Sequence, residues 1–197
     1  MKLTTRQLTL CAVLTALALA LSYVENFLPL TLLIPLPGIK LGLANIVTLF
    51  ALYALGPGQA LAILTARCLL GSIFAGNLNA MLFSVMGGLA AMGVMTLLSR
   101  LRRLSIYGVS MGGAAAHNCG QTAAAVIALG NTAPLAYLPV LLAASVFSGI
   151  LTGYLAGLLF RALAHAGPEN RRPGPTGKNN AAGSGGLTEG GLHETQG

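Results

Sequence analysis

Residues 79–99, NAMLFSVMGGLAAMGVMTLLS, form an apolar run without a charged side chain. The length of this run is close to the roughly 20 residues that an α-helix needs to cross the hydrocarbon core of a bilayer. Other apolar runs precede and follow it, and between residues 7 and 99 the formal charges are limited to Glu25, Lys40 and Arg67. The pattern predicts an all-α polytopic membrane protein.

The composition supports this fold class and excludes several functions. Of 197 residues, 55% are hydrophobic and 8% are charged, whereas about a quarter of the residues in a soluble domain are charged. The chain contains no Asp, so chemistry that depends on an Asp cluster is excluded. The net charge of +7 comes from Arg and Lys at the ends of apolar runs. We therefore expect contact with anionic membrane lipid and no binding of nucleic acid.

Pro, Gly, Asn and Arg residues divide the apolar sequence into six predicted transmembrane helices. Their approximate limits are 7–28, 41–56, 58–76, 79–99, 107–130 and 135–163. The connection from Pro29 to Lys40 is apolar but broken by proline, so we expect a loop or a re-entrant segment there. Residues 1–165 are thus predicted to form one transmembrane domain. Residues 166–197 are poor in apolar side chains and are predicted to be a disordered cytoplasmic tail.

The basic residues predict the orientation of these helices. They cluster before the first span (Lys2, Arg6), between the fourth and fifth (100–103), and after the sixth (161–172). With six spans, all three clusters fall on one side, which the positive-inside rule identifies as cytoplasmic. Both termini are therefore expected in the cytoplasm.

A stripe of small residues marks the first span. Ala12, Ala16 and Ala20 recur every four residues and so lie on one face of a helix. Such a stripe allows another helix to approach closely. Two interpretations are open, namely packing within the chain and docking of a partner protein.

Two polar side chains interrupt the second and third spans. Asn45 lies inside an apolar run, and its amide needs a hydrogen-bond partner, so it either ties helices together or lines a site. Arg67 lies near the middle of the third span, where an unpaired cation is costly. Its charge is balanced by Glu25 or by backbone carbonyls, or by an anionic group of a ligand or partner, or the side chain lies at the membrane interface.

The fifth span contains the densest polar group. Gln121 follows His117 by four residues and Asn118 by three, so the three side chains share one broad helix face. They form either a ligand site or a hydrogen-bond network between helices. A single His without Cys or carboxylate neighbours does not indicate a metal site, and no cofactor is predicted. Asn79 either caps the fourth helix or lies at the mouth of an outward-facing cavity.

These motifs resemble a known family. The segments PGIKLGLANIVTLFAL (37–52), NAMLFSVMGG (79–88) and GGAAAHNCGQ (112–121), in this order, are similar to those of the bacterial Gx transporter family. That family is also called heptaprenyl diphosphate synthase component I and resembles the substrate-binding S components of energy-coupling-factor (ECF) transporters. The resemblance implies a six-helix S-component fold in the bacterial cytoplasmic membrane, with a ligand pocket that opens outward.

The same resemblance implies a division of labour between subunits. The stripe Ala12, Ala16 and Ala20 would dock on the transmembrane T subunit, and separate ATPases would drive transport. The sequence is compatible, because it contains no G-x-x-x-x-G-K-[ST] motif. Without Asp, it also cannot supply the Asp-rich Mg²⁺ site of a prenyl diphosphate synthase, so we do not expect an enzyme.

Two functions follow from these observations. The first is a substrate-binding subunit of an uptake transporter, in which a small-molecule ligand contacts His117, Asn118, Gln121, Asn45, Arg67 and Asn79. The second is a non-catalytic membrane accessory of heptaprenyl or polyprenyl diphosphate synthesis that binds isoprenoid in an apolar groove. A closed polar pocket favours the first function, and a lateral apolar groove favours the second.

Overall fold

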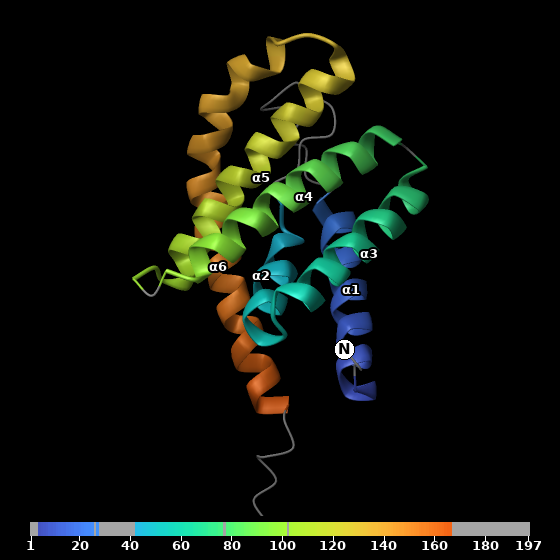
Figure 1. Ribbon diagram of the computed structural model, residues 1–197, viewed down its shortest axis with the longest axis vertical. Helices are drawn as coiled ribbons and strands as arrows, with labels where there is room; N and C mark the ends of the chain where they lie inside the picture. Colours follow the sequence, from blue (N-terminus) through green and yellow to red (C-terminus); the bar gives the residue numbers. More distant parts are fainter. Residues whose placement is uncertain (1–3, 26, 28–41, 77, 102, 167–197) are drawn as a thin grey trace, which may run out of the picture.

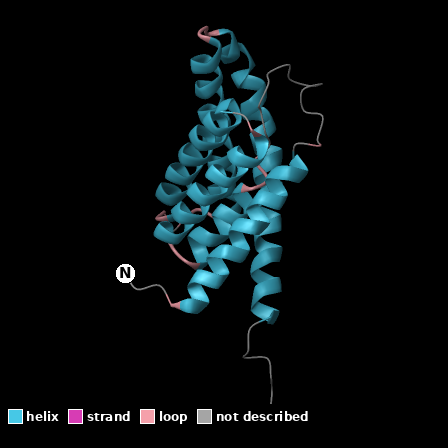
Figure 2. Ribbon diagram, turned by 90° about the vertical axis from the view of Figure 1, so that its right-hand side faces the viewer, coloured by secondary structure: helices cyan, strands magenta, loops and turns pink. Residues whose placement is uncertain are grey.

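A computed structural model describes residues 4–25, 27, 42–76, 78–101 and 103–166 of the chain. Throughout these residues the regular structure is helical (Figure 2). The elements in order are α1 (Thr5–Glu25), α2 (Asn45–Ala54), α3 (Pro57–Ala75), α4 (Leu78–Ser99), α5 (Ile106–Leu129), the short 3₁₀ helix η2 (Ala133–Tyr137) and α6 (Leu138–Ala166). The all-α prediction is confirmed for this part of the chain. The predictions for Pro29 to Lys40 and for the tail after residue 166 lie outside the described residues.

The helix ends follow local sequence signals. Gly76 and Gly130 end α3 and α5 in the left-handed conformation, with φ of 60° and 64°, which costs glycine little. At the start of α5, the hydroxyl of Ser105 accepts a hydrogen bond from the backbone amide of Gly108. Pro57 begins α3 at a position where its missing N–H costs nothing.

Among the described residues, four helical segments are long and apolar enough to cross a membrane, namely Thr5–Glu25, Pro57–Phe74, Leu78–Ser99 and Ala133–Ala162. α5 has sufficient length at 24 residues, but its polar and glycine-rich sequence makes it less apolar than these four. α2 has 10 residues instead of the 16 in the predicted span 41–56. At about 1.5 Å per residue this helix is shorter than a bilayer core.

The helices form an elongated bundle in which neighbours in the sequence pack together. α4 lies along α5, and α5 lies along α6. The start of α1 and the end of α6 lie at the same end of the molecule, at the bottom of Figure 1, while the connection from α5 to α6 is at the top. α2 lies inside the bundle, in contact with α1, α3, α4, α5 and α6.

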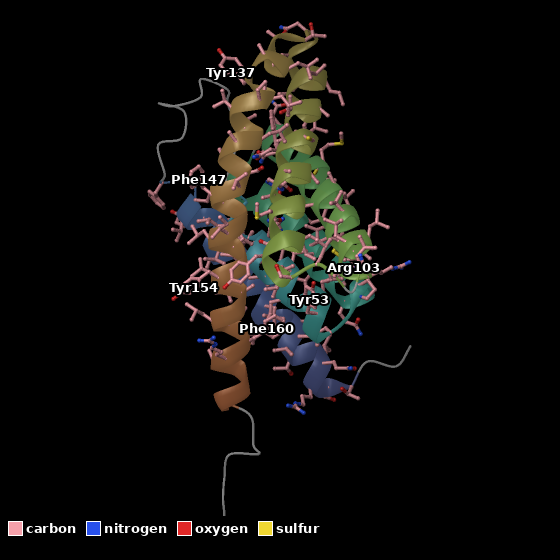
Figure 3. The ribbon with its side chains drawn as sticks, turned by 90° about the vertical axis from the view of Figure 1, so that its left-hand side faces the viewer. Tyr53, Arg103, Tyr137, Phe147, Tyr154 and Phe160 are labelled. Carbon is pink, nitrogen blue, oxygen red and sulfur yellow. The ribbon has the colours of Figure 1, made fainter. Side chains whose placement is uncertain are left out.

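The apolar core surrounds α2. Val47, Leu49 and Ala51 of this helix are completely buried, and they pack with buried residues of α1, α3 and α4 in one cluster. Near one end of the core, the ring of Phe160 on α6 lies 4.6 Å from that of Phe50 and 6.5 Å from that of Tyr53. Figure 3 shows Tyr53 and Phe160 close together in this region.

Much of the outer surface is apolar. Phe147 and Tyr154 project from α6 (Figure 3), and Phe147 is 78% exposed. Ile73, Phe74 and Leu78, at the turn between α3 and α4, are also exposed. An apolar surface of this extent on a helical bundle is what lipid contact requires. The described residues therefore belong to a membrane protein.

Candidate functional site

Arg67 is the central residue of the candidate site. It occupies the middle of α3 and is 6% exposed. Its Nη2 donates to Oδ1 of Asn45 on α2, and its Nη1 donates to Oγ of Ser22 on α1, both at 3.4 Å. Glu25, also on α1, attracts it electrostatically. Arg67 therefore links three helices through neutral partners, with a carboxylate nearby.

Glu25 has a second role at the end of α1. Its Oε1 accepts a hydrogen bond from the backbone amide of Gly42, just before α2. Gly42 has a φ of 81°, and a Cβ there would lie 2.8 Å from Nδ2 of Asn45 and 3.2 Å from Cδ2 of His117. Only glycine combines this backbone conformation with such close approach. The backbone at residue 42 is thus held between α1, α2 and α5.

Two glycines of α4 lie against polar side chains of α3 and α5. A Cβ at Gly87 would lie 2.9 Å from both Cε1 of His117 and Cγ of Gln121. A Cβ at Gly88 would lie 3.3 Å from Nη2 of Arg67. The glycine pair therefore lets α4 approach both the guanidinium of α3 and the imidazole and amide of α5 closely.

A cavity lies between α1, α3 and α4. Its volume is about 460 Å³, within the range typical of small-molecule pockets. Polar groups on its wall come from Arg67, Tyr23 and three serines, and the remaining wall is mostly apolar. The lining residues are Leu19, Ala20, Ser22, Tyr23, Arg67, Gly71, Ser72, Phe74, Ala80 and Ser84.

The structure brings some of the predicted site residues together and separates others. Arg67 and Asn45 are in contact, Asn45 and His117 both lie against Gly42, and His117 and Gln121 both lie against Gly87. Asn118 faces the other way, where its Nδ2 donates to the backbone oxygen of Leu141 on α6 at 2.7 Å. Asn79 is exposed in the first turn of α4.

The alanine stripe is on the surface of α1. Ala12, Ala16 and Ala20 are exposed, whereas Leu14 and Ala18 between them are buried. The stripe is therefore not buried by the described residues of this chain. Docking of a partner on it stays a prediction.

The three serines of the cavity were not among the predicted site residues. Ser22, Ser72 and Ser84 lie on three helices, and serine is common in membrane helices, so no spacing distinguishes them. A polar residue in each of three apolar spans was the available signal. In the described part of the chain, no group of three His, Cys, Asp or Glu side chains is arranged to hold a metal ion.

Comparison with known families identifies the chain. The family model for heptaprenyl diphosphate synthase component I matches residues 14–159. This chain belongs to that family. No curated protein and no solved structure gave a match. The matched range begins within α1 and ends within α6, so the family covers every helix that contributes to the cavity.

Proposed function

We propose that this chain is the substrate-binding membrane subunit of an ATP-driven transporter that takes up a small molecule, similar to the S components of ECF transporters. The observation that carries the proposal is the cavity of about 460 Å³ with the buried guanidinium of Arg67 on its wall. Pockets that bind small molecules are mostly apolar and contain a few polar groups that orient the ligand. This cavity has that composition, but it is not the closed polar pocket that we expected for transport, because its wall is mostly apolar and includes the exposed Tyr23 and Phe74.

In this proposal the chain crosses the membrane six times, with both termini in the cytoplasm. α2 and α5 are the two helices that length or hydropathy alone does not assign to the membrane. Most of α2 is buried, and so is the polar side of α5 that includes His117 and Gln121. Helices shielded from lipid by their neighbours need neither the full length nor the apolar character of a lipid-exposed span.

The proposed partners are a T subunit and ATPases. The exposed stripe of Ala12, Ala16 and Ala20 offers a surface on which a helix of the T subunit could lie close to α1. ATP hydrolysis in separate subunits would then reorient the bundle and release ligand inside. The sequence has no phosphate-binding loop of its own and no Asp, so we propose neither catalysis nor a cofactor for this chain.

The alternative is a non-catalytic accessory of heptaprenyl or polyprenyl diphosphate synthesis. The family description favours it, and so does the apolar part of the cavity wall, where Leu19 and Phe74 would suit an isoprenoid chain. In that case the partner would be a synthase subunit that supplies the Mg²⁺ ligands missing here.

Native mass spectrometry of the full chain, gently extracted from its own host, tests the proposal. We expect a bound small molecule, a T subunit with ATPases, or both. Ala80→Leu, which fills part of the cavity, should remove the small molecule. Ala143→Leu makes the same change on the exposed face of α6 and should not. A synthase subunit bound to the chain, with no T subunit and no ligand sensitive to Ala80→Leu, would support the accessory function instead.

A further inference from the structure

The guanidinium of Arg67 retains unused hydrogen-bonding capacity. The group has five N–H donors, and the hydrogen bonds it makes in the described part of the chain are the two 3.4 Å contacts to Asn45 and Ser22. Its Nε is buried there without a partner. A buried cation with long, neutral contacts gains most from a close anionic acceptor. The cavity is the space from which such an acceptor can approach.

The neighbouring hydroxyl of Ser22 is suited to the same acceptor. Its Oγ accepts from Arg67 Nη1, so its own proton remains available to donate. Among the described residues no acceptor receives that proton. Arg67 and Ser22 therefore present donors from α3 and α1 on a cavity wall that also includes the apolar side chains of Leu19 and Phe74.

We propose that the cavity binds a singly charged anion attached to an apolar body, with the anionic group at Arg67 and Ser22. This inference rests on the proposed function and specifies the class of ligand. Among the described residues, Arg67 is the one cationic residue on the wall, and the Glu25 carboxylate lies near it. A diphosphate brings two or more further negative charges, which this single cation could not compensate once they are buried. A carboxylate or a phosphodiester adds the least negative charge that can still accept hydrogen bonds from Arg67 and Ser22.

Two sources could supply this chemistry, a free carboxylate from solution and a membrane phospholipid. Tyr23 and Phe74 on the wall are 65% and 79% exposed, so the cavity is bordered by residues that also lie on the outer surface of the bundle. The test therefore includes a probe for each source. Octanoate represents the free carboxylate, and dioctanoyl phosphatidylglycerol represents the phospholipid.

The experiment is native mass spectrometry of the full chain titrated with these two probes, with the neutral octan-1-ol and with geranyl diphosphate. We expect one singly charged probe to bind at least about tenfold more tightly than octan-1-ol and geranyl diphosphate, because a charge-assisted hydrogen bond contributes a factor of this size. Whichever singly charged probe binds more tightly identifies the source.

Arg67→Gln should abolish the preference for the singly charged probe, and Arg67→Lys should retain part of it. Arg103→Gln, at an exposed arginine between α4 and α5, should change nothing.

If Arg67→Gln does not fold, Ala80→Leu still tests the proposal. This second variant leaves Arg67 in place and should lower the affinity for the singly charged probe by about tenfold or more. The proposal would be overturned if octanoate, phospholipid and octanol bound equally well, or if geranyl diphosphate bound most tightly. It would also be overturned if the preference for a singly charged probe were unaffected by Arg67→Gln or by Ala80→Leu. An endogenous ligand that Ala80→Leu removes but Arg67→Gln does not would overturn the anionic class and preserve the transport function.

Discussion

Asn118 on α5 is bonded to the backbone of Leu141 on α6, with Nδ2 as the donor at 2.7 Å, and the asparagine side chain is 5% exposed. His117, the preceding residue, lies against Gly87 on α4 instead. Two adjacent polar residues thus belong to two different helix interfaces. Asn118 therefore stabilises the contact between α5 and α6, and His117 belongs to the contact between α4 and α5.

We expect Asn118→Leu to lower the free energy of unfolding by about 1 kcal/mol, the size of a hydrogen bond between membrane helices. Ligand binding in the cavity should persist, because α5 and α6 do not line it. Thermal unfolding in detergent measures the change, and Cys119→Leu, at the exposed neighbouring residue of α5, is the control. An unfolding temperature equal to that of the wild type would show that the bond contributes no stability.

Gly120 allows the close approach of α4 and α5. A Cβ at this position would lie 2.5 Å from the carbonyl oxygen of Met86, which belongs to the backbone and cannot rotate away. Gly120→Ala should therefore force the helices apart and lower the free energy of unfolding by about 1–3 kcal/mol.

The matched control for this change is Gly93→Ala. Gly93 is also within a helix, but a Cβ there would meet no atom within 4 Å. Alanine favours the helix over glycine by up to about 1 kcal/mol, so this variant should be as stable as the wild type or more stable. If both variants unfolded at the same temperature, the close α4–α5 contact would not be the reason for glycine at position 120.

Ala16→Leu tests the exposed stripe on α1. The side chain is exposed, so the larger residue should leave the stability of the isolated chain unchanged while preventing close approach of a partner helix. Co-purification with a co-expressed T subunit should fall by about tenfold or more, since a steric clash at a helix contact exceeds 1.4 kcal/mol. Ala143→Leu on α6 should not reduce it. Full recovery of the T subunit with Ala16→Leu would exclude the stripe as the docking surface.

The helices could be predicted from sequence because Pro, Gly, Asn and Arg residues divide the apolar sequence into separate runs. Gly76 and Gly130 end helices within one residue of the predicted limits of 76 and 130. α2 is shorter than predicted, because residues 42–44 are apolar but Gly42 has a positive φ that a helix does not allow. Apolar character alone does not show where such a run becomes helical.

The partners of polar residues could be predicted only in part. Asn45 and Arg67 stood out because each is a polar side chain in an apolar run, and the structure places them in contact. The different interfaces of His117 and Asn118 were not predictable, because consecutive residues are about 100° apart on a helix and the sequence does not say which helix lies on each side. The cavity depends on small and hydroxylated residues from three helices, whose meeting is a property of the packing.

The proposed orientation of six spans makes a prediction for the two connections flanking α5. Arg103 precedes α5 and Asn131 follows it, and both side chains are exposed. In a background in which Cys11, Cys68 and Cys119 are replaced by Ala, Asn131→Cys should react with a membrane-impermeant maleimide on intact cells. Arg103→Cys should react only after the membrane is permeabilised. Labelling of both positions on intact cells would mean that α5 does not cross the membrane, and labelling of Arg103→Cys alone would invert the orientation that the basic residues predict.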